Sequence, residues 1–359
     1  MEKKFRKIGV LTSGGDAPGM NPCIRAITRK GIEQGVEVVG ILGGYKGLID
    51  NSMVSLNPRS VSNIITRGGT MLYSERCPEF KTEEGVLAAV ETCKKNNIDA
   101  IVAIGGDGTF RGATDLTRYG IPTIGIPGTI DNDITATDYT IGFDTAMNTV
   151  LSLIDDLRDT CESHARCNVV EVMGRDCGYI ALNSGIAAGA VSIAIPEIPF
   201  NEAETIEKIK SVKAAGKRGM IVVLSEGVSV AMGENYGEVL TKRIEAETGI
   251  SSRFARFAHI VRGGSPSLRD RLTATEMGVL AVELLLKGVS NVVICEVDGA
   301  IKPIEINFAL ILDRMYKGKL KDGDLDMFTA TQIEEMRLIC QERSFNIQHL
   351  YNISRDICK

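Results

Sequence analysis

The sequence predicts an α/β protein with parallel sheets, because short apolar runs alternate with amphipathic stretches along most of the chain. A second observation supports this class: glycine-rich loops follow the expected strands, and ligands of α/β proteins bind where strands end. In the first half of the chain, the expected strands are "KIGVLT", "VEVVGIL", "DAIVAIGG" and "IPTIGIPG", and the expected helices are 22–34 and 110–120.

The second half of the chain repeats this pattern. The expected strands are "CNVVEVMG", "AVSIAIP", "GMIVVLSEG", "FAHIVRGG" and "NVVICEV", and the expected helices are 144–160, 202–215, 236–248 and 270–287. The segment from about residue 320 onward is polar and helical in pattern. The apolar spacing of Ile333, Met336, Ile339 and Cys340 predicts an amphipathic helix there, packed on its own subunit.

Composition and charge narrow the class of protein. The chain has 359 residues, of which 44% are hydrophobic and 24% charged, which is typical of a soluble globular protein of two domains. Its net charge of -5 argues against binding to nucleic acid or to an anionic membrane. We expect a cytoplasmic protein with reduced thiols, because no secretory segment or membrane span is apparent and the nine cysteines include no CxxC pair.

The first glycine-rich loop, Thr12–Met20, reads "TSGGDAPGM" and leads from a strand into a helix. Such a loop directs backbone N–H groups toward an anion at the start of the helix. A tight turn without a ligand explains the same residues equally well. The loop matches neither GxGxxG nor the Walker A pattern.

The second loop, Gly105–Thr109, reads "GGDGT". Its three glycines leave the backbone open to close approach by a phosphate, and Asp107 is a candidate ligand for Mg²⁺, which prefers a carboxylate together with phosphate oxygens and water. For Thr109, the alternative role is a cap of the following helix.

The third loop, Pro127–Asp133, reads "PGTIDND". Asp131 is a candidate to accept a proton from a sugar hydroxyl, with Asp133 supporting it or the metal. A turn rich in Asp and Asn is the alternative. Because Asp107 and Asp131 follow successive strands, we expect both to face a single cleft.

Five motifs occur in order: "TSGGDAPGMN", "GGDGT", "PGTIDND", "VMGRDCGYIA" and "HIVRGGSPS". Together they closely resemble the 6-phosphofructokinase family, in its bacterial ATP-dependent type, from residue 7 to about 300. The resemblance implies two Rossmann-like three-layer α/β/α domains with mostly parallel sheets and the active site in the cleft between them. The expected ATP-binding domain is 1–140 plus about 266–315, and the expected fructose 6-phosphate-binding domain is about 141–265 plus 316–359.

The resemblance also implies the residues that bind MgATP and catalyse the transfer. Those expected at the ATP phosphates are Gly15, Arg76, Cys77, Gly106, Asp107, Gly108 and Thr109, with Asp107 serving Mg²⁺. Asp131 matches the general base, which takes the proton of the C1 hydroxyl of fructose 6-phosphate. The residues expected to act in catalysis beside Asp131 are Gly15, Arg76, Thr129 and Arg175.

A further set of residues matches positions that bind the sugar phosphate in this family. These are Thr129, Ile130, Asp131, Met173, Gly174, Arg175, Glu226, His259, Ile260, Val261 and Arg262. Arg166 and Arg253 match arginines that reach the phosphate from a neighbouring subunit, which implies at least a homodimer and, by family, a homotetramer. Arg256 lies three residues from Arg253 and competes with it for this role. Arginine suits phosphate because its planar fork donates two hydrogen bonds.

Two glycines bear on the phosphoryl donor. In pyrophosphate-using relatives, the positions matching Gly108 and Gly128 carry aspartate and lysine, whose side chains and charges would occupy the place of an inner phosphate of ATP. Both are glycine here, which favours ATP over a diphosphate donor. Lipid and NAD kinases share GGDG but lack "PGTIDND" followed by "MGR". A non-catalytic sugar-phosphate sensor is disfavoured because both Asp107 and Asp131 are present.

The resemblance implies an effector site for ADP or phosphoenolpyruvate that is altered in this chain. Its matching basic residues are Arg25, Arg29, Arg158 and Lys217. Three positions differ: Pro58 replaces an arginine, Val191 a metal-binding glutamate and Ala215 a lysine. Arg59 is adjacent to Pro58. Because the site loses a carboxylate and a cation, we expect a modified or absent response to these effectors.

Overall fold

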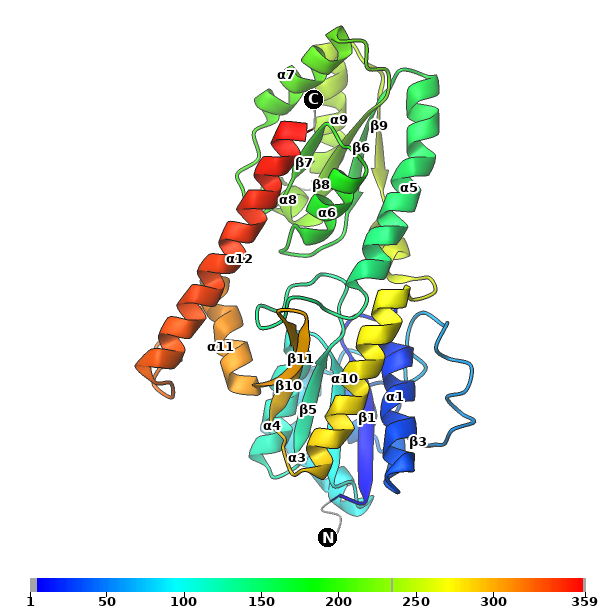
Figure 1. Cartoon of the computed structure of the whole chain (residues 1–359), viewed down its shortest axis with the longest axis vertical. Helices are drawn as coiled ribbons and strands as arrows, with labels where there is room; N and C mark the ends of the chain where they lie inside the picture. The colour runs from blue at the N-terminus through cyan, green and yellow to red at the C-terminus, as the bar shows by residue number, and fades with distance from the viewer. Residues whose placement is uncertain (1–4, 234, 358–359) are drawn as a thin grey trace. The chain divides into compact units, whose positions relative to one another are not determined.

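The computed structural model describes residues 5–233 and 235–357. They form two compact units, which we describe one at a time (Figure 1). Unit 1 holds the chain up to Ile130, then Ile134–Asp144 and Arg262–Cys340, and unit 2 holds Asp131–Asp133, Thr145–Val261 and the chain from Gln341 onward. Residues 316–340 lie in unit 1 together with the first part of the chain, whereas the boundaries expected from the sequence put 316–359 in the second domain.

Unit 1 is built around a seven-stranded sheet in the order β11-β10-β5-β4-β1-β2-β3. Its strands are β1 (Lys7–Ser13), β2 (Glu37–Ile41), β3 (Met53–Leu56), β4 (Ala100–Gly105), β5 (Thr123–Pro127), β10 (Val292–Val297) and β11 (Ala300–Glu305). The five inner strands are parallel, and only the two outermost, β3 and β11, pair antiparallel with their neighbours. The prediction of mostly parallel sheets is confirmed.

Helices cover both faces of this sheet, because β1, β4 and β5 are buried along nearly their whole length and successive side chains point to opposite faces. α1 and α10 pack against each other on one face, and the other face carries a large apolar cluster that includes α3, α4, α11 and Met336 of α12 (Figure 1). The helices of unit 1 are α1 (Met20–Glu33), α2 (Tyr45–Ile49), the 3-10 turn η1 (Pro78–Lys81), α3 (Glu83–Lys95), α4 (Asp107–Arg118), α10 (Leu268–Leu286), α11 (Ile306–Tyr316) and the first part of α12 (Ala330–Ile357).

Unit 2 has a four-stranded parallel sheet in the order β7-β8-β6-β9. Its elements are α5 (Phe143–Ser163, which begins in unit 1), β6 (Cys167–Val172), α6 (Tyr179–Ala187), β7 (Ser192–Ala194), α7 (Glu202–Ala214), β8 (Met220–Ser225), α8 (Glu226–Met232), α9 (Tyr236–Thr248), β9 (Ser252–Arg256) and the 3-10 turn η2 (Ala258–Arg262, which ends in unit 1). α7, α8 and α9 pack on one face, and α6 packs on Ile193 of the other. Both units are therefore three-layer α/β/α structures.

One strand prediction is wrong. "FAHIVRGG" was expected to be a strand, but Ala258–Arg262 forms the 3-10 turn η2, and the strand β9 ends two residues earlier. The apolar run misleads because its residues do not share one environment. Val261 is fully buried, whereas Ile260 is 60% exposed and Ala258 has a φ of 43° that no strand accommodates.

A buried carboxylate holds the segment that follows β5 in unit 1. Asp270, in the first turn of α10, is 0% exposed and accepts hydrogen bonds from the Tyr139 hydroxyl (2.5 Å) and the Gly142 N–H (2.6 Å). Burial and the neighbouring Asp270 raise the pKa of Tyr139, so this hydroxyl remains a donor. The Arg269 guanidinium lies 4.0 Å from the centre of the Tyr139 ring. These contacts fix residues 139–142 onto α10.

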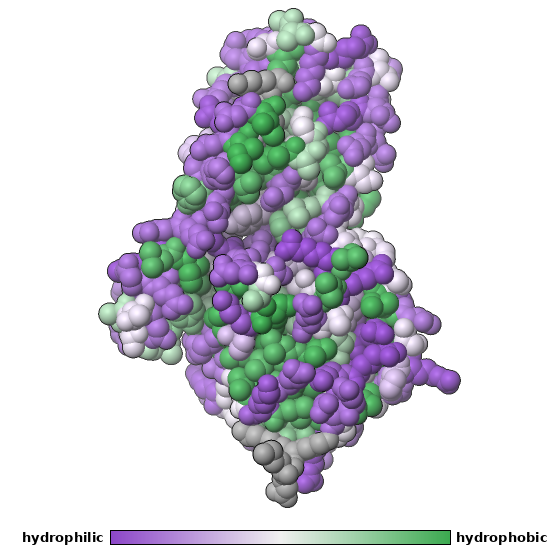
Figure 2. Space-filling view, in the orientation of Figure 1, coloured by the Kyte–Doolittle hydropathy of each residue, from purple (hydrophilic) through white to green (hydrophobic). Residues whose placement is uncertain are grey.

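The C-terminal helix α12 is the amphipathic helix expected from the sequence. Met336 is fully buried, and Ile339 and Cys340 pack against the apolar cluster of unit 1, which confirms that the tail packs on its own chain. In the part of α12 that belongs to unit 2, the Arg355 guanidinium pairs with Glu204 of α7. None of the described helices has the length and apolar character needed to cross a membrane. On the visible face of the chain, hydrophilic and apolar residues are interleaved (Figure 2).

Candidate active site

Three loops of unit 1 start at the carboxyl ends of adjacent parallel strands. β1 and β4 pair Ser13 with Gly105, and β4 and β5 pair Gly105 with Pro127. The loops that follow, "GGDAPG", "GGDGT" and "GTI", therefore begin at the same level of one edge of the sheet. This is the arrangement expected from the strand order of the sequence, and it is where α/β proteins bind ligands.

The GGDGT glycines differ in their surroundings. A Cβ atom at Gly105 would lie 2.3 Å from both the Ser13 carbonyl oxygen and Thr109 Oγ1, so no side chain fits there. At Gly106 and Gly108, a Cβ atom would meet no atom within 4 Å. Open space thus lies beside the first turn of α4, where free N–H groups and the helix dipole favour an anion.

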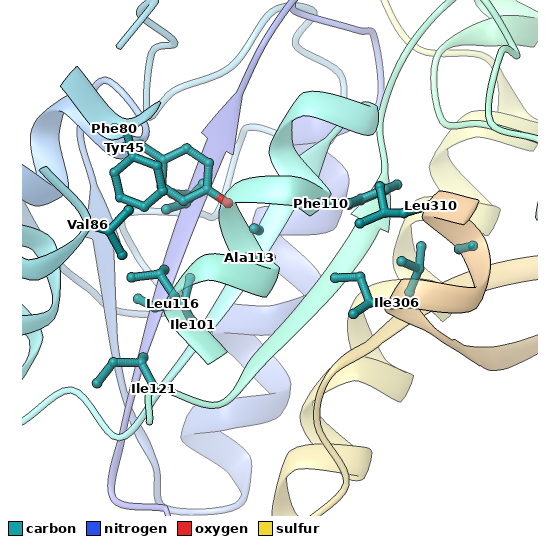
Figure 3. Close-up of a cluster of buried hydrophobic side chains, with 14 of the residues drawn as sticks. Tyr45, Phe80, Val86, Ile101, Phe110, Ala113, Leu116, Ile121, Ile306 and Leu310 are labelled. Carbon is teal, nitrogen blue, oxygen red and sulfur yellow. The ribbon is translucent and has the colours of Figure 1, made fainter. Parts of the chain in front are cut away.

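Thr109 does not cap α4, because the N-cap position is Gly106 and no side chain caps the helix. Instead the buried Thr109 hydroxyl donates to the Ser13 carbonyl oxygen at 3.2 Å, and so joins α4 to the end of β1. Its own carbonyl oxygen accepts a hydrogen bond of 2.6 Å from the Tyr45 hydroxyl. Tyr45 stacks on Phe80 with ring centres 4.1 Å apart, beside α4 (Figure 3). The start of α4 is therefore held from two sides.

Asp107 is the first residue of α4, and its carboxylate forms an ion pair with Arg111 one turn later. Only 17% of the Asp107 side chain is exposed. In residues 5–233 and 235–357, no group of three or more His, Cys, Asp or Glu side chains is arranged to hold a metal ion. One carboxylate beside open space fits Mg²⁺ bound mainly through phosphate oxygens and water, which needs no larger protein cluster.

Arg76 and Cys77 end a long segment, residues 57–77, that has no regular secondary structure. Arg76 is exposed, and the half-buried Cys77 thiol lies 3.7 Å from a Glu79 carboxylate oxygen. Burial raises the pKa of Cys77, which disfavours a thiolate there. A neutral thiol does not repel the phosphates of a nucleotide.

Side chains from the first loop and its flanks hold this irregular segment. The Thr12 hydroxyl donates to the Tyr73 carbonyl oxygen at 2.8 Å, and the Ser74 hydroxyl donates to the Gly14 carbonyl oxygen at 2.6 Å. The buried Asn21 amide accepts from the Met71 N–H at 2.7 Å. The sequence does not predict these contacts, because each joins positions about 50 or more residues apart.

Gly15 and Arg262 meet in unit 1. A Cβ atom at Gly15 would lie 2.6 Å from an Arg262 guanidinium nitrogen, and the same guanidinium donates to the Asp16 carbonyl oxygen at 3.1 Å. The glycine therefore makes room for the arginine. Arg262, which is expected to bind the sugar phosphate, therefore packs against the first glycine-rich loop, which is expected to bind ATP phosphates.

The loop after β5 has a buried backbone. Thr129 is 9% exposed and Ile130 is fully buried, and the Thr129 carbonyl oxygen accepts a hydrogen bond of 2.6 Å from the Thr140 hydroxyl. At Gly128, a Cβ atom would lie 3.0 Å from Ile104 and 3.2 Å from Met20, so a larger residue needs these side chains to move. This crowding differs from the open space at Gly108.

In unit 2, Asp131–Asp133 group with the "MGRDCG" loop that follows β6. Asp131 is 6% exposed, and Asp133 lies 3.9 Å from the Arg175 guanidinium. The Arg175 side chain is 70% exposed, which leaves its guanidinium accessible to a ligand. Met173 is 9% exposed, so its side chain packs in the interior.

Glu226, the first residue of α8, fixes the backbone of this loop. One carboxylate oxygen accepts from the N–H groups of Gly174 (3.1 Å) and Arg175 (2.6 Å). Both residues have positive φ, 148° and 55°, so the carboxylate stabilises an unusual turn. A similar carboxylate was missed in the sequence: Glu197 accepts from the Gly178 N–H at 2.8 Å, and burial raises its pKa.

The structure distinguishes the two arginines of β9. Arg256 pairs with Glu171 at 2.6 Å, and this buried carboxylate also accepts from the Ser229 hydroxyl at 2.5 Å. Arg256 therefore balances a charge inside unit 2. Arg253 is exposed, and its guanidinium donates to the Ser252 carbonyl oxygen at 2.7 Å. This geometry favours Arg253 over Arg256 as the arginine available to a phosphate.

The remaining sugar-phosphate candidates of unit 2 differ in accessibility. His259 is exposed and Ile260 is 60% exposed, whereas the fully buried Val261 offers at most its backbone to a ligand. Arg166, which precedes β6, is half-buried.

The expected effector residues fall in both units. Arg25 and Arg29 lie one turn apart on α1 in unit 1, where burial and Arg29 lower the pKa of Arg25. Arg158 and Lys217 are in unit 2, and the Arg158 guanidinium donates to the Ala188 carbonyl oxygen. Val191 is fully buried. The effector role of these residues stays a prediction.

Comparison with known proteins adds an independent finding. The family model for phosphofructokinase matches residues 7–285. The chain is 50% identical over 312 residues to the ATP-dependent 6-phosphofructokinase of Clostridioides difficile, covering 87% of this chain and 96% of that protein. It is 49% identical over 318 residues to the protein of the same name from Clostridium novyi, covering 89% and 98%.

Solved structures give the same result. Phosphofructokinase from Saccharomyces cerevisiae matches with a TM-score of 0.81 and 31% identity over 89% of this chain, which spans about half (47%) of the yeast chain. A pyrophosphate-dependent phosphofructokinase from Marinobacter aquaeolei matches with a TM-score of 0.75 at 22% identity, covering 84% of this chain and 83% of that one, which shows a shared fold.

Proposed function

Because the chain belongs to the phosphofructokinase family, we propose that it transfers the γ-phosphoryl group of ATP to the C1 hydroxyl of fructose 6-phosphate. The products are fructose 1,6-bisphosphate and ADP, as in a glycolytic ATP-dependent 6-phosphofructokinase. The observation that carries this proposal is the open space at Gly106 and Gly108, beside the start of α4, in a chain 50% identical to enzymes named for this reaction.

Asp131 is the general base of this reaction. Its carboxylate takes the proton of the C1 hydroxyl, the C1 oxygen forms a bond to the γ-phosphorus, and the bond from that phosphorus to the oxygen of ADP breaks. Thr129 and Arg175 orient the reacting groups. The accessible guanidinium of Arg175 and its proximity to Asp133 support this role.

The ATP phosphates bind at Gly15, Arg76, Cys77 and Gly106–Thr109, where N–H groups and a guanidinium offset their charge. Asp107 would hold Mg²⁺, which would supply charge neutralisation at the phosphate oxygens. In that role Asp107 would give up its ion pair with Arg111. ATP is favoured over diphosphate because Gly108 offers room without a negative side chain.

The sugar phosphate is bound by Gly174, Glu226, His259 and Arg262, with backbone contacts from Ile130, Met173, Ile260 and Val261. Arg166 and Arg253 act on the site of a neighbouring subunit, in an assembly that is at least a homodimer and, by family, a homotetramer. The exposure of Arg253 on β9, an edge strand, supports this role. A cytoplasmic location is supported by the cysteines of the described residues, which are all free thiols.

The test is a donor comparison combined with removal of the base. Wild-type protein is assayed for fructose 1,6-bisphosphate with MgATP and, separately, with magnesium diphosphate. We expect product with ATP only. Asp131→Ala is expected to lower kcat by several orders of magnitude while fructose 6-phosphate still binds in calorimetry. Product with diphosphate only would refute the ATP assignment, and an Asp131→Ala variant with near wild-type kcat would refute the base.

A further inference from the structure

Backbone strain in this chain lies close to the proposed site residues. Ten non-glycine residues of the described chain have positive φ. Six are Asn or Asp, which tolerate this conformation well. The other four are Tyr73, Ala165, Arg175 and Ala258. Each is a proposed site residue or lies within three positions of one.

Tyr73 is the unusual member of this group. Its φ is 59°, in the left-handed region that disfavours a bulky side chain, and glycine or asparagine is the ordinary choice there. Strain of this kind persists where the surrounding structure imposes it, and it concentrates at functional sites. An aromatic residue at this position therefore requires a reason.

The backbone on both sides of Tyr73 is fixed to the first glycine-rich loop. The Thr12 hydroxyl donates to the Tyr73 carbonyl oxygen at 2.8 Å, and the next residue, Ser74, donates from its hydroxyl to the Gly14 carbonyl oxygen at 2.6 Å. Arg76, which is expected to contact the donor phosphates, follows three residues after Tyr73. Tyr73 thus lies at the carboxyl end of β1, among the residues proposed to bind ATP.

The protein's own packing does not explain the aromatic side chain. Tyr73 is 65% exposed, so little of its apolar surface is buried to offset the backbone strain. Glycine at this position would keep the hydrogen bonds that Thr12 and Ser74 donate and would relieve the strain. The benefit of the ring must therefore arise in a complex.

We propose that Tyr73 is a further donor-binding residue, whose ring contacts the bound nucleoside triphosphate and shields its phosphates from water. This inference rests on the proposed function. We assign the contact of Tyr73 to the phosphoryl donor and not to the sugar phosphate, because Tyr73 and Ser74 are bound to Thr12 and Gly14. Both residues belong to the first glycine-rich loop, which is proposed to bind ATP phosphates. Excluding water from the transferred group limits hydrolysis of ATP in place of transfer.

The first experiment uses the absence of tryptophan from the sequence. In a Tyr73→Trp variant, the new indole is the only tryptophan, and its emission reports contact with a ligand. We expect MgADP and a non-hydrolysable MgATP analogue to change the emission, and fructose 6-phosphate alone to leave it unchanged. Phe345→Trp, at a residue 68% exposed on α12, is the control and should respond to neither.

The second experiment uses Tyr73→Gly, which removes the ring and the strain together. We expect the KM for ATP to rise at least fivefold and ATP hydrolysis without sugar to increase relative to transfer, while the thermal midpoint stays equal or rises. Asn51→Gly is the matched control, because Asn51 has a φ of 56° and no proposed role. It should leave the KM for ATP and the ratio of ATP hydrolysis to transfer unchanged.

Two results would overturn the inference. One is a Tyr73→Gly variant with wild-type KM for ATP and wild-type hydrolysis. The other is a Tyr73→Trp emission that responds only to fructose 6-phosphate, which would move Tyr73 to the acceptor. Failure of the proposed function looks different, since wild-type protein would then form no fructose 1,6-bisphosphate from MgATP, whatever residue 73 is.

Discussion

A single charge placed at Gly108 tests the assignment of the donor. In Gly108→Asp, the new side chain starts at the second residue of α4, in space where a Cβ atom meets nothing within 4 Å. The fold should accept it, because an acidic residue near a helix start is favourable and glycine is a poor helix former. We therefore expect a thermal midpoint equal to or slightly above that of wild type.

The effect on ATP is large because the new carboxylate lies beside the proposed phosphates. Two unit charges ~5 Å apart at an effective dielectric of ~20 repel by roughly 3 kcal/mol. That free energy corresponds to about a hundredfold loss of kcat/KM for MgATP. Gly108→Asn is the matched control, since it has nearly the same size without the charge.

The assay compares kcat/KM for MgATP in the two variants, at saturating fructose 6-phosphate, together with their unfolding midpoints. The Asp variant should be much weaker than the Asn variant while both remain folded. Equal kcat/KM values in the two variants would show that no phosphate of the donor lies near residue 108, and the proposed ATP site would be wrong.

Three further predictions follow from the geometry. Asp270→Ala removes the acceptor of two buried donors and should lower the free energy of unfolding by ~3–5 kcal/mol, measured by urea titration. Arg256→Ala leaves the Glu171 charge buried and should cost ~2–4 kcal/mol, whereas Arg253→Ala should raise the KM for fructose 6-phosphate without that loss; equal stabilities would contradict the distinction. At subsaturating fructose 6-phosphate, MgADP and phosphoenolpyruvate should change the rate less than twofold, and strong activation by MgADP would refute the altered effector site.

The sheet of unit 1 and its three loops could be predicted because local sequence determines them. Buried strands of seven and six residues that lead into glycines are visible in "KIGVLTSGG" and "AIVAIGG", and their order along the chain implies parallel pairing. The antiparallel edge strands β3 and β11 were missed. β3 has only four residues, of which only Leu56 is buried, and β11 is exposed along most of its length, so neither has the buried apolar run that marks an inner strand.

The anchoring of residues 57–77 could not be predicted for a different reason. Nothing local to Thr12, Asn21 or Ser74 indicates their partners, which lie about 50 or more residues away. The η2 error has a similar origin: an apolar run predicts burial but not which of its residues is buried. Only the structure shows that Val261 points into the core while Ile260 is exposed.

The glycines of "GGDG" are required for two different physical reasons, close packing and space for a ligand. The sequence alone does not show which reason applies to which glycine. Gly105 is required for packing, because any side chain would collide with the Ser13 carbonyl oxygen and Thr109. Gly106 and Gly108 meet no such obstacle, and the fold alone would accept larger residues there. What keeps them small must then be a ligand that needs the space. The opposite case is Tyr73. Glycine would adopt its backbone conformation with less strain, yet a large residue is present. Where the fold alone favours a different residue from the one present, contact with a bound ligand explains the residue.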